Sequence, residues 1–149
     1  MKNILVLQVP NLNMIGSRET NIYGNDTAEN IALQVIAHAE NIGFGCKVYQ
    51  SNHEGEIIDF LQSAKRQFDA IIINAGAFTH YSIAIYDAIL CAGIPVVEVH
   101  MTNIYKREEF RQKSVIAPAC VGQITGFGKD VYFLALDALK MLLLKGEDK

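Results

Sequence analysis

The apolar stretches ILVLQV at residues 4–9 and FDAIII at residues 68–73 decide the fold of this chain. Both are rich in β-branched residues and hardly alternate between apolar and polar positions, which is typical of parallel strands covered on both faces. The stretches PVVEV at residues 95–99 and CVGQI at residues 120–124 have the same character, and residues 46–50 form a weaker fifth run. We therefore expect five short strands, four of them buried.

Helical patterns separate these strands. Asp26 and Thr27 precede the first pattern as a cap and Gly43 ends it, while a Ser51-Asn52 cap precedes the second. Because parallel neighbours need right-handed helical crossovers, the alternation predicts an α/β fold with a doubly wound sheet. Five strands favour the flavodoxin-like order 2-1-3-4-5 in a single domain over residues 1–149. The expected helices span residues 27–42, 54–65, 81–91 and 130–144.

Composition excludes several classes of protein. Half of the 149 residues are hydrophobic, 19% are charged and the net charge is -3, which argues against disorder and against binding to nucleic acid or to an anionic membrane surface. The three cysteines are too few and too widely spaced for a disulfide framework. The N-terminus has no signal-peptide pattern and no apolar run is long enough to span a bilayer. We expect a cytoplasmic protein with buried cysteines.

The sheet itself predicts where a ligand binds. Ligands of doubly wound sheets lie outside the carboxyl ends of the strands, at the switch point between strands 1 and 3. Polar residues do gather after Val9 and after Ile73, and again where the fourth strand ends. The first strand runs into a long loop, residues 10–25, of the kind that usually serves as a lid or a binding loop.

Familiar cofactor motifs are missing from these loops. Residues 122–129 have the wrong glycine spacing for a phosphate loop, and Asp130 stands where that loop needs Ser or Thr. No dinucleotide fingerprint follows the first strand, and neither a zinc-protease helix nor a nucleophile elbow occurs. We expect a polar pocket that works without a cofactor or a metal.

Glu98 and His100 are the first candidate pair in this pocket. They lie two residues apart on a strand, so their side chains leave the same face. A carboxylate beside an imidazole selects one tautomer and favours the protonated ring, which suits a general acid near neutral pH. A salt bridge at the end of a strand, without a chemical role, is the alternative.

Other polar residues each allow two interpretations. Arg18 and Tyr23 share the loop after the first strand. In one interpretation the guanidinium of Arg18 favours the phenolate form of Tyr23, which then acts as a base. In the other, a contact between the two side chains only stabilises the loop. Asn74 and His80 flank a glycine turn at the switch point, as ligands or as a turn-stabilising amide and a surface imidazole. Asp87 lies within a helix, where a solvated charge is the default.

Six short motifs, in this order and at this spacing, resemble the type II dehydroquinases, the 3-dehydroquinate dehydratases of the shikimate pathway. The resemblance covers essentially the whole chain. The motifs are Pro10-Asn11-Leu12-Asn13, Gly16-Ser17-Arg18-Glu19 with Ile22-Tyr23-Gly24, Gln50 to Glu56, Ile73 to Ala77 with Thr79-His80, Glu98-Val99-His100 and Arg107 to Arg111.

The resemblance implies a reaction: removal of water from a cyclic β-hydroxy ketone that carries a carboxylate, through an enolate and without a Schiff base or metal. In that mechanism Tyr23 is the base, and Arg18 favours its phenolate form. Asn11 helps to hold the water that stabilises the enolate oxygen, and His100 protonates the leaving hydroxyl while Glu98 positions it.

The same resemblance implies how 3-dehydroquinate is bound. The backbone amides of Met101 and Thr102 form a cradle for its carboxylate together with Asn74. His80 and Arg111 contact the ring hydroxyls. The resemblance also implies a homo-oligomer, a dodecamer built from trimers, in which Asp87 reaches the site of a neighbouring subunit.

One departure from the family pattern stands beside the site. Members usually have Asn-Gly before the Pro-Asn-Leu motif, whereas this chain has Gln8-Val9. Two alternative functions therefore stay open. One is a binding module without catalysis on the same scaffold, and the other is a hydro-lyase for a different hydroxy-keto acid.

Overall fold

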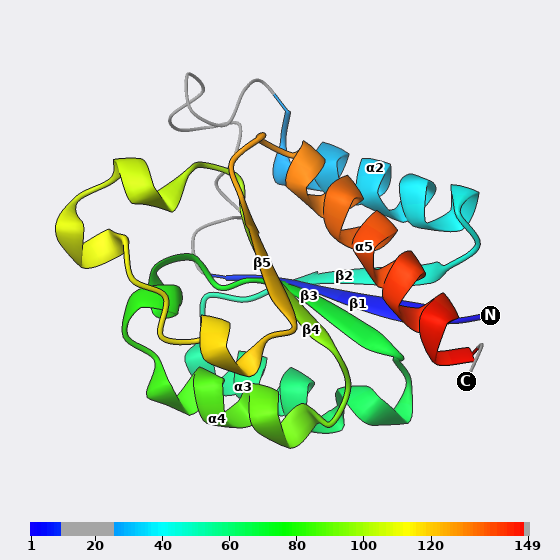
Figure 1. Ribbon diagram of the computed structural model, residues 1–149, viewed down its shortest axis with the longest axis horizontal. Coiled ribbons are helices and arrows are strands. Elements are labelled where there is room, and N and C mark those ends of the chain that lie inside the picture. The colour runs from blue at the N-terminus through cyan, green and yellow to red at the C-terminus, as the bar shows by residue number, and fades with distance from the viewer. Residues whose placement is uncertain (10–25, 148–149) are drawn as a thin grey trace.

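The computed structural model describes residues 1–9 and 26–147, which form one parallel five-stranded sheet. The observed order β2-β1-β3-β4-β5 confirms the predicted flavodoxin-like order (Figure 1). Every neighbouring pair of strands is parallel. The strands are β1 (Asn3–Gln8), β2 (Gly45–Gln50), β3 (Ala70–Asn74), β4 (Val96–His100) and β5 (Gly122–Thr125).

Helices cover both faces of the sheet. The helices α2 (Ala28–Asn41) and α5 (Asp130–Glu147) pack on one face, and α3 (Glu54–Ser63) and α4 (Ile83–Ala92) pack on the other (Figure 1). Alternate residues of each central strand enter the two layers, because successive side chains point to opposite faces. In β1, Ile4 packs with the first layer and Leu5 with the second. The two cores are therefore separated by the sheet, as the unalternated apolar runs predicted.

Local hydrogen bonds set the helix boundaries. The Thr27 hydroxyl accepts from the Asn30 amide (3.1 Å), which confirms the predicted cap of α2. Helix α4 begins later than predicted, because the hydroxyl of Ser82 accepts from the amide of Ile85 (3.0 Å) and acts as its cap. The predicted Ser51 cap of α3 was wrong: its hydroxyl accepts from the amide of His53, and His53 holds the cap position without a side-chain bond.

Two burial predictions were also wrong. Strand β5 was expected to be covered on both faces, but Gly122 is exposed and the rest of the strand is half-buried, because β5 lies at the edge of the sheet. Cys91 was expected in the core and is exposed on α4, whereas Cys46 and Cys120 are half-buried. Local hydrophobicity does not distinguish an edge strand from a central one.

The carboxyl ends of the strands are lined by irregular segments. The 3-10 helix η3 (Gly76–His80) follows β3. A longer connection of three 3-10 helices leads from the carboxyl end of β4 to the start of β5. Its first two helices lie at the same edge of the sheet, and the third lies beside α4 (Figure 1). These are η4 (Ile104–Lys106), η5 (Glu109–Arg111) and η6 (Ala117–Ala119). Within the described residues, no helix is both long enough and apolar enough to cross a membrane.

Candidate active site

The predicted Glu98–His100 pair forms at the end of β4. His100 Nε2 lies 2.6 Å from Glu98 Oε2, and both side chains are buried, with Glu98 fully inaccessible to solvent. The two residues alternate with Val97 and Val99, which pack toward α2 and α5, so the pair points to the opposite face. A carboxylate oxygen accepts only, so Nε2 carries the hydrogen and Nδ1 is the ring nitrogen that can exchange a proton.

Glu98 has two further partners that sequence reasoning missed. Ser114 Oγ lies 2.9 Å from Glu98 Oε1, and Gln123 Nε2 lies 2.8 Å from Glu98 Oε2. Gln123 stands opposite Glu98 in the β4–β5 register. A signal for this contact was present, since a glutamine inside an expected buried strand needs a polar partner.

His80, at the end of η3, is held as one tautomer. Its Nδ1 lies 2.8 Å from the carbonyl oxygen of Lys113, which can only accept, so Nδ1 carries the hydrogen. Its Nε2 is then a hydrogen-bond acceptor, buried and without a partner among the described residues. Burial lowers the pKa of His80, the Lys113 carbonyl opposes this, and the positive charges of His100, Arg107 and Arg111 lower it further. His80 therefore offers a neutral acceptor to a ligand hydroxyl.

We expect this lowered pKa to make the protein less stable in mild acid. An unfolded histidine binds a proton near pH 6.5, whereas folded His80 does so only at lower pH. In the window below about pH 6.5 the unfolded chain holds more protons, so the free energy of unfolding falls as the pH falls. Denaturant unfolding of the wild type and of His80→Gln, at about pH 7.5 and about pH 5.5, measures this effect.

His80→Gln should lose part of the decrease in stability between the two pH values. His53→Gln, at an exposed histidine, is the matched control and should keep the whole decrease. The same pH dependence in the wild type and in His80→Gln would contradict the expected protonation difference.

Asn74 makes the contacts of a turn-stabilising residue. Its Nδ2 donates to the hydroxyl of Tyr132 on α5 (3.0 Å), and its Oδ1 accepts from the amide of Gly76 (3.3 Å). Gly76 has a φ of 54°, in the left-handed region that favours glycine. Asn74 follows Ile72 on the α5 side of β3, so it leaves the sheet on the face opposite His100.

The remaining predicted ligands sit along the connection after β4. The side chain of Met101 is buried in the core, and the carbonyl of Met101 accepts from the amide of Gly128 (2.9 Å). The hydroxyl of Thr102 accepts a hydrogen bond from Arg107 Nη2, a contact that sequence reasoning did not foresee. Arg111 Nε lies 3.0 Å from Glu108 Oε2 at the surface.

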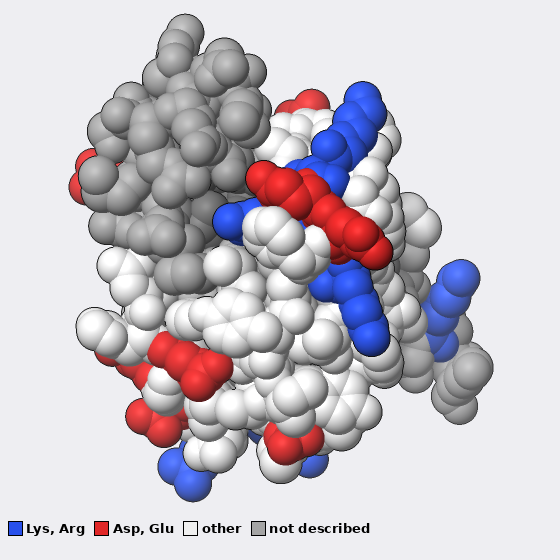
Figure 2. Space-filling view, turned by 90° about the vertical axis from the view of Figure 1, so that its left-hand side faces the viewer, with Lys and Arg blue, Asp and Glu red and all other residues white. Residues whose placement is uncertain are grey.

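Charge gathers on this side of the molecule. Lys and Arg side chains lie together with Asp and Glu on the upper part of the face in Figure 2, and a mostly uncharged area separates them from further charged side chains along the lower edge. Arg107 and Arg111 are close enough for their charges to act on His80.

Asp87 is exposed on α4. The predicted catalytic residues Asn11, Arg18 and Tyr23 lie outside the described residues, so their roles stay predictions.

Comparisons with known proteins give the family. The family described as Dehydroquinase class II matches residues 2–140. The chain is 56% identical to the 3-dehydroquinate dehydratase of Caldicellulosiruptor bescii, over 96% of this chain and 99% of that protein. It is 54% identical to the enzyme of the same name from Clostridium acetobutylicum, over 95% and 99% of the two chains.

A solved structure agrees with these relatives. The type II dehydroquinase from Butyrivibrio crossotus superimposes with a TM-score of 0.90 at 46% identity, covering 93% of this chain and 97% of that one. Sequence and fold therefore agree over nearly the whole length of the chain. The chain belongs to the class II dehydroquinase family.

Proposed function

We propose that this chain is a carbon–oxygen lyase that removes water from 3-dehydroquinate to give 3-dehydroshikimate, a step of the shikimate pathway. The observation that carries the proposal is the buried Glu98–His100 pair at the carboxyl end of β4, in a chain that belongs to the dehydroquinase family. An imidazole held by a carboxylate at the ligand-binding edge of the sheet is a suitable general acid for a leaving hydroxyl.

The reaction proceeds in two proton transfers. Tyr23, with Arg18 favouring its phenolate form, takes the proton from the carbon next to the ketone, and the electrons move to the ketone oxygen. Asn11 holds a water against the resulting enolate oxygen. The enolate then expels the β-hydroxyl, which leaves as water with a proton from His100 Nδ1. No metal and no organic cofactor takes part in this sequence.

The substrate is held by groups at the carboxyl ends of β3 and β4 and in the segments that follow these strands. His80 Nε2 is an acceptor, so it receives a hydrogen bond from a ring hydroxyl, and Arg111 contacts a second ring oxygen. The backbone amides of Met101 and Thr102, with Asn74, hold the carboxylate. Asn74 can join them only if its amide group gives up one of its present contacts with Tyr132 and Gly76.

We propose that the active enzyme is a homododecamer built from trimers, in which Asp87 reaches the site of a neighbouring subunit. We expect Asp87→Asn to raise KM roughly tenfold in the assembled protein, because a hydrogen bond to a charged group is lost, and to change kcat little. KM is measured above and below the protein concentration at which sedimentation shows dissociation.

The exposed carboxylate of Asp59 on α3 provides the matched control, and Asp59→Asn should leave KM unchanged. An equal rise of KM in assembled and dissociated Asp87→Asn would mean that Asp87 serves its own subunit. An unchanged KM in both would remove Asp87 from the site.

We also propose a cytoplasmic location. The three cysteines are Cys46, Cys91 and Cys120, and all three are free thiols. Free thiols persist in reducing compartments, whereas secreted domains of this size often pair them.

Ultraviolet absorbance of the protein mixed with 3-dehydroquinate tests the proposed function, because dehydration creates a conjugated enone. The assay is repeated after treatment with borohydride in the presence of substrate, which would trap and inactivate a lysine Schiff base. We expect the chromophore to appear and to be insensitive to borohydride. A flat trace from folded protein, followed by turnover of another cyclic or acyclic hydroxy-keto acid, would overturn the substrate assignment.

A further inference from the structure

The buried carboxylate of Glu98 is held by three partners from three parts of the chain. His100 Nε2 on β4 (2.6 Å) and Gln123 Nε2 on β5 (2.8 Å) contact its Oε2, and Ser114 Oγ from the segment between η5 and η6 (2.9 Å) contacts its Oε1. Glu98 is fully inaccessible to solvent, so these bonds replace its hydration. Each partner brings a hydrogen, as a carboxylate requires.

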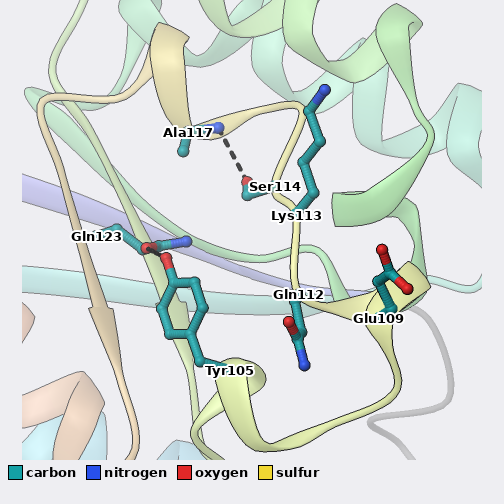
Figure 3. Close-up of a pocket in the computed structure, with 7 residues that line it drawn as sticks. All are labelled: Tyr105, Glu109, Gln112, Lys113, Ser114, Ala117 and Gln123. Atoms are coloured by element: carbon teal, nitrogen blue, oxygen red, sulfur yellow. Dashed lines mark hydrogen bonds between the residues drawn. The ribbon is translucent and has the colours of Figure 1, made fainter.

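Both Ser114 and Gln123 are themselves oriented as donors. The Ser114 hydroxyl accepts from the amide of Ala117 (3.0 Å, Figure 3), so its single proton is directed at Glu98. Tyr105 donates to Gln123 Oε1 (3.2 Å), which leaves the amide nitrogen of Gln123 facing Glu98. Figure 3 shows the Tyr105 ring directed at Gln123 from η4.

The backbone holds Ser114 in place as well. The neighbouring amide of Val115 donates to the carbonyl of Thr79 in η3 (2.8 Å), and the carbonyl of Lys113 accepts from His80. The segment that carries Ser114 is therefore bound to the segment that carries His80. An open groove of about 620 Å³ lies beside these contacts, and Ser114, Gln123 and Tyr105 are among the residues that line it (Figure 3).

We propose that Ser114 and Gln123 are positioning residues for proton donation by His100. They hold Glu98 as a carboxylate in one orientation, which keeps the hydrogen on His100 Nε2 and leaves Nδ1 to protonate the leaving hydroxyl. This inference rests on the proposed function of His100. It assigns a role to two residues that contact Glu98 and act on His100 through it.

The charged and titratable surroundings of Glu98 fit this role. His100 lies on the same strand, and Cys120 lies on the segment that enters β5. Burial, and then the charge of Glu98, raises the pKa of the Cys120 thiol to about 12, so this thiol is neutral. The Cys120 thiol donates to the carbonyl of Ile116 (3.5 Å), so it is not one of the donors that hold Glu98.

The test compares Ser114→Ala and Gln123→Met, which remove the donors and nearly keep the volumes, with the wild type. We expect kcat to fall roughly tenfold in each variant while KM stays within about twofold. Ser114→Thr keeps the hydroxyl and should restore most of kcat.

Matched controls are Ser63→Ala and Gln62→Met, at exposed positions on α3, which should leave kcat and KM unchanged. Wild-type kcat in Ser114→Ala and Gln123→Met would overturn the inference. So would a loss in kcat with a matching rise in KM that Ser114→Thr does not reverse. If Ser114→Ala does not fold, Gln123→Met decides.

His100→Ala, measured in the same series, separates this inference from the proposed function. Collapse of turnover in His100→Ala with full activity in Ser114→Ala and Gln123→Met would overturn only the positioning role. Retained turnover in His100→Ala would overturn the proposed function of the pair.

Discussion

Replacing His100 with alanine is expected to lower kcat roughly 10²- to 10⁴-fold, the usual contribution of a positioned general acid. A hydroxide ion is a poor leaving group, so the leaving oxygen needs a proton. The imidazole of His100 can donate this proton from one ring nitrogen while its other nitrogen is hydrogen-bonded to Glu98. KM should change little, because His100 acts on the hydroxyl only as it departs. Steady-state kinetics with the enone absorbance measure both constants.

A second histidine gives the control for this substitution. On α2, His38 Nε2 lies 2.9 Å from Asp137 Oδ1, and the His38 ring packs against Phe133. His38→Ala should keep normal kcat and KM. A small acid such as imidazolium, added to His100→Ala, should restore part of kcat by entering the space left by the ring. Turnover of His100→Ala within a few-fold of the wild type would remove His100 as the acid.

Much of the fold was predictable because its signals are local. A parallel sheet covered on two faces is indicated by the unalternated runs at residues 4–9 and 68–73 and by the periodic apolar positions between them. The right-handedness of crossover connections then limits the possible strand orders, and the observed order agrees. The errors came from position in the whole molecule. The composition of residues 120–124 does not show that β5 lies at an edge, although the predicted order 2-1-3-4-5 already places it there. Nothing near Cys91 tells which face of α4 turns outward.

The contacts of the site also include some that the sequence could predict and some that it could not. Glu98 and His100 could be paired from sequence because a strand brings residues two apart to one face. The contact of His80 with Lys113 spans 33 residues, and that of Glu98 with Ser114 spans 16, across irregular segments and short 3-10 helices. Such segments have no periodicity that fixes which side chains meet.

Gln123 is an intermediate case. The predicted strand order makes β4 and β5 parallel neighbours, and the observed register sets residue 98 opposite residue 123. The sequence alone leaves that register open by a residue or two, because both strands are short. The hydrogen bond from Gln123 to Glu98 is the contact that the register makes possible.

Replacing Tyr23 with phenylalanine is expected to lower kcat roughly 10²- to 10⁴-fold and to leave substrate binding almost unchanged, because only the proposed base atom is removed. The measurement is the same enone assay, with equilibrium binding of a non-reacting substrate analogue beside it. Tyr49→Phe, at a β2 ring that stacks on Phe60, is the matched control and should keep full turnover. Near-normal turnover of Tyr23→Phe would remove Tyr23 as the base.

Hydrogen exchange separates the roles of Tyr23 and His100. If an enolate forms before the hydroxyl leaves, His100→Ala can still take the proton next to the ketone and return a deuteron from D₂O, although it cannot complete the dehydration. Tyr23→Phe should lose both exchange and dehydration, because the first proton transfer is blocked. Exchange that persists in Tyr23→Phe would place the base elsewhere. Its loss in His100→Ala would mean that proton removal and hydroxyl departure occur together, without a separate enolate.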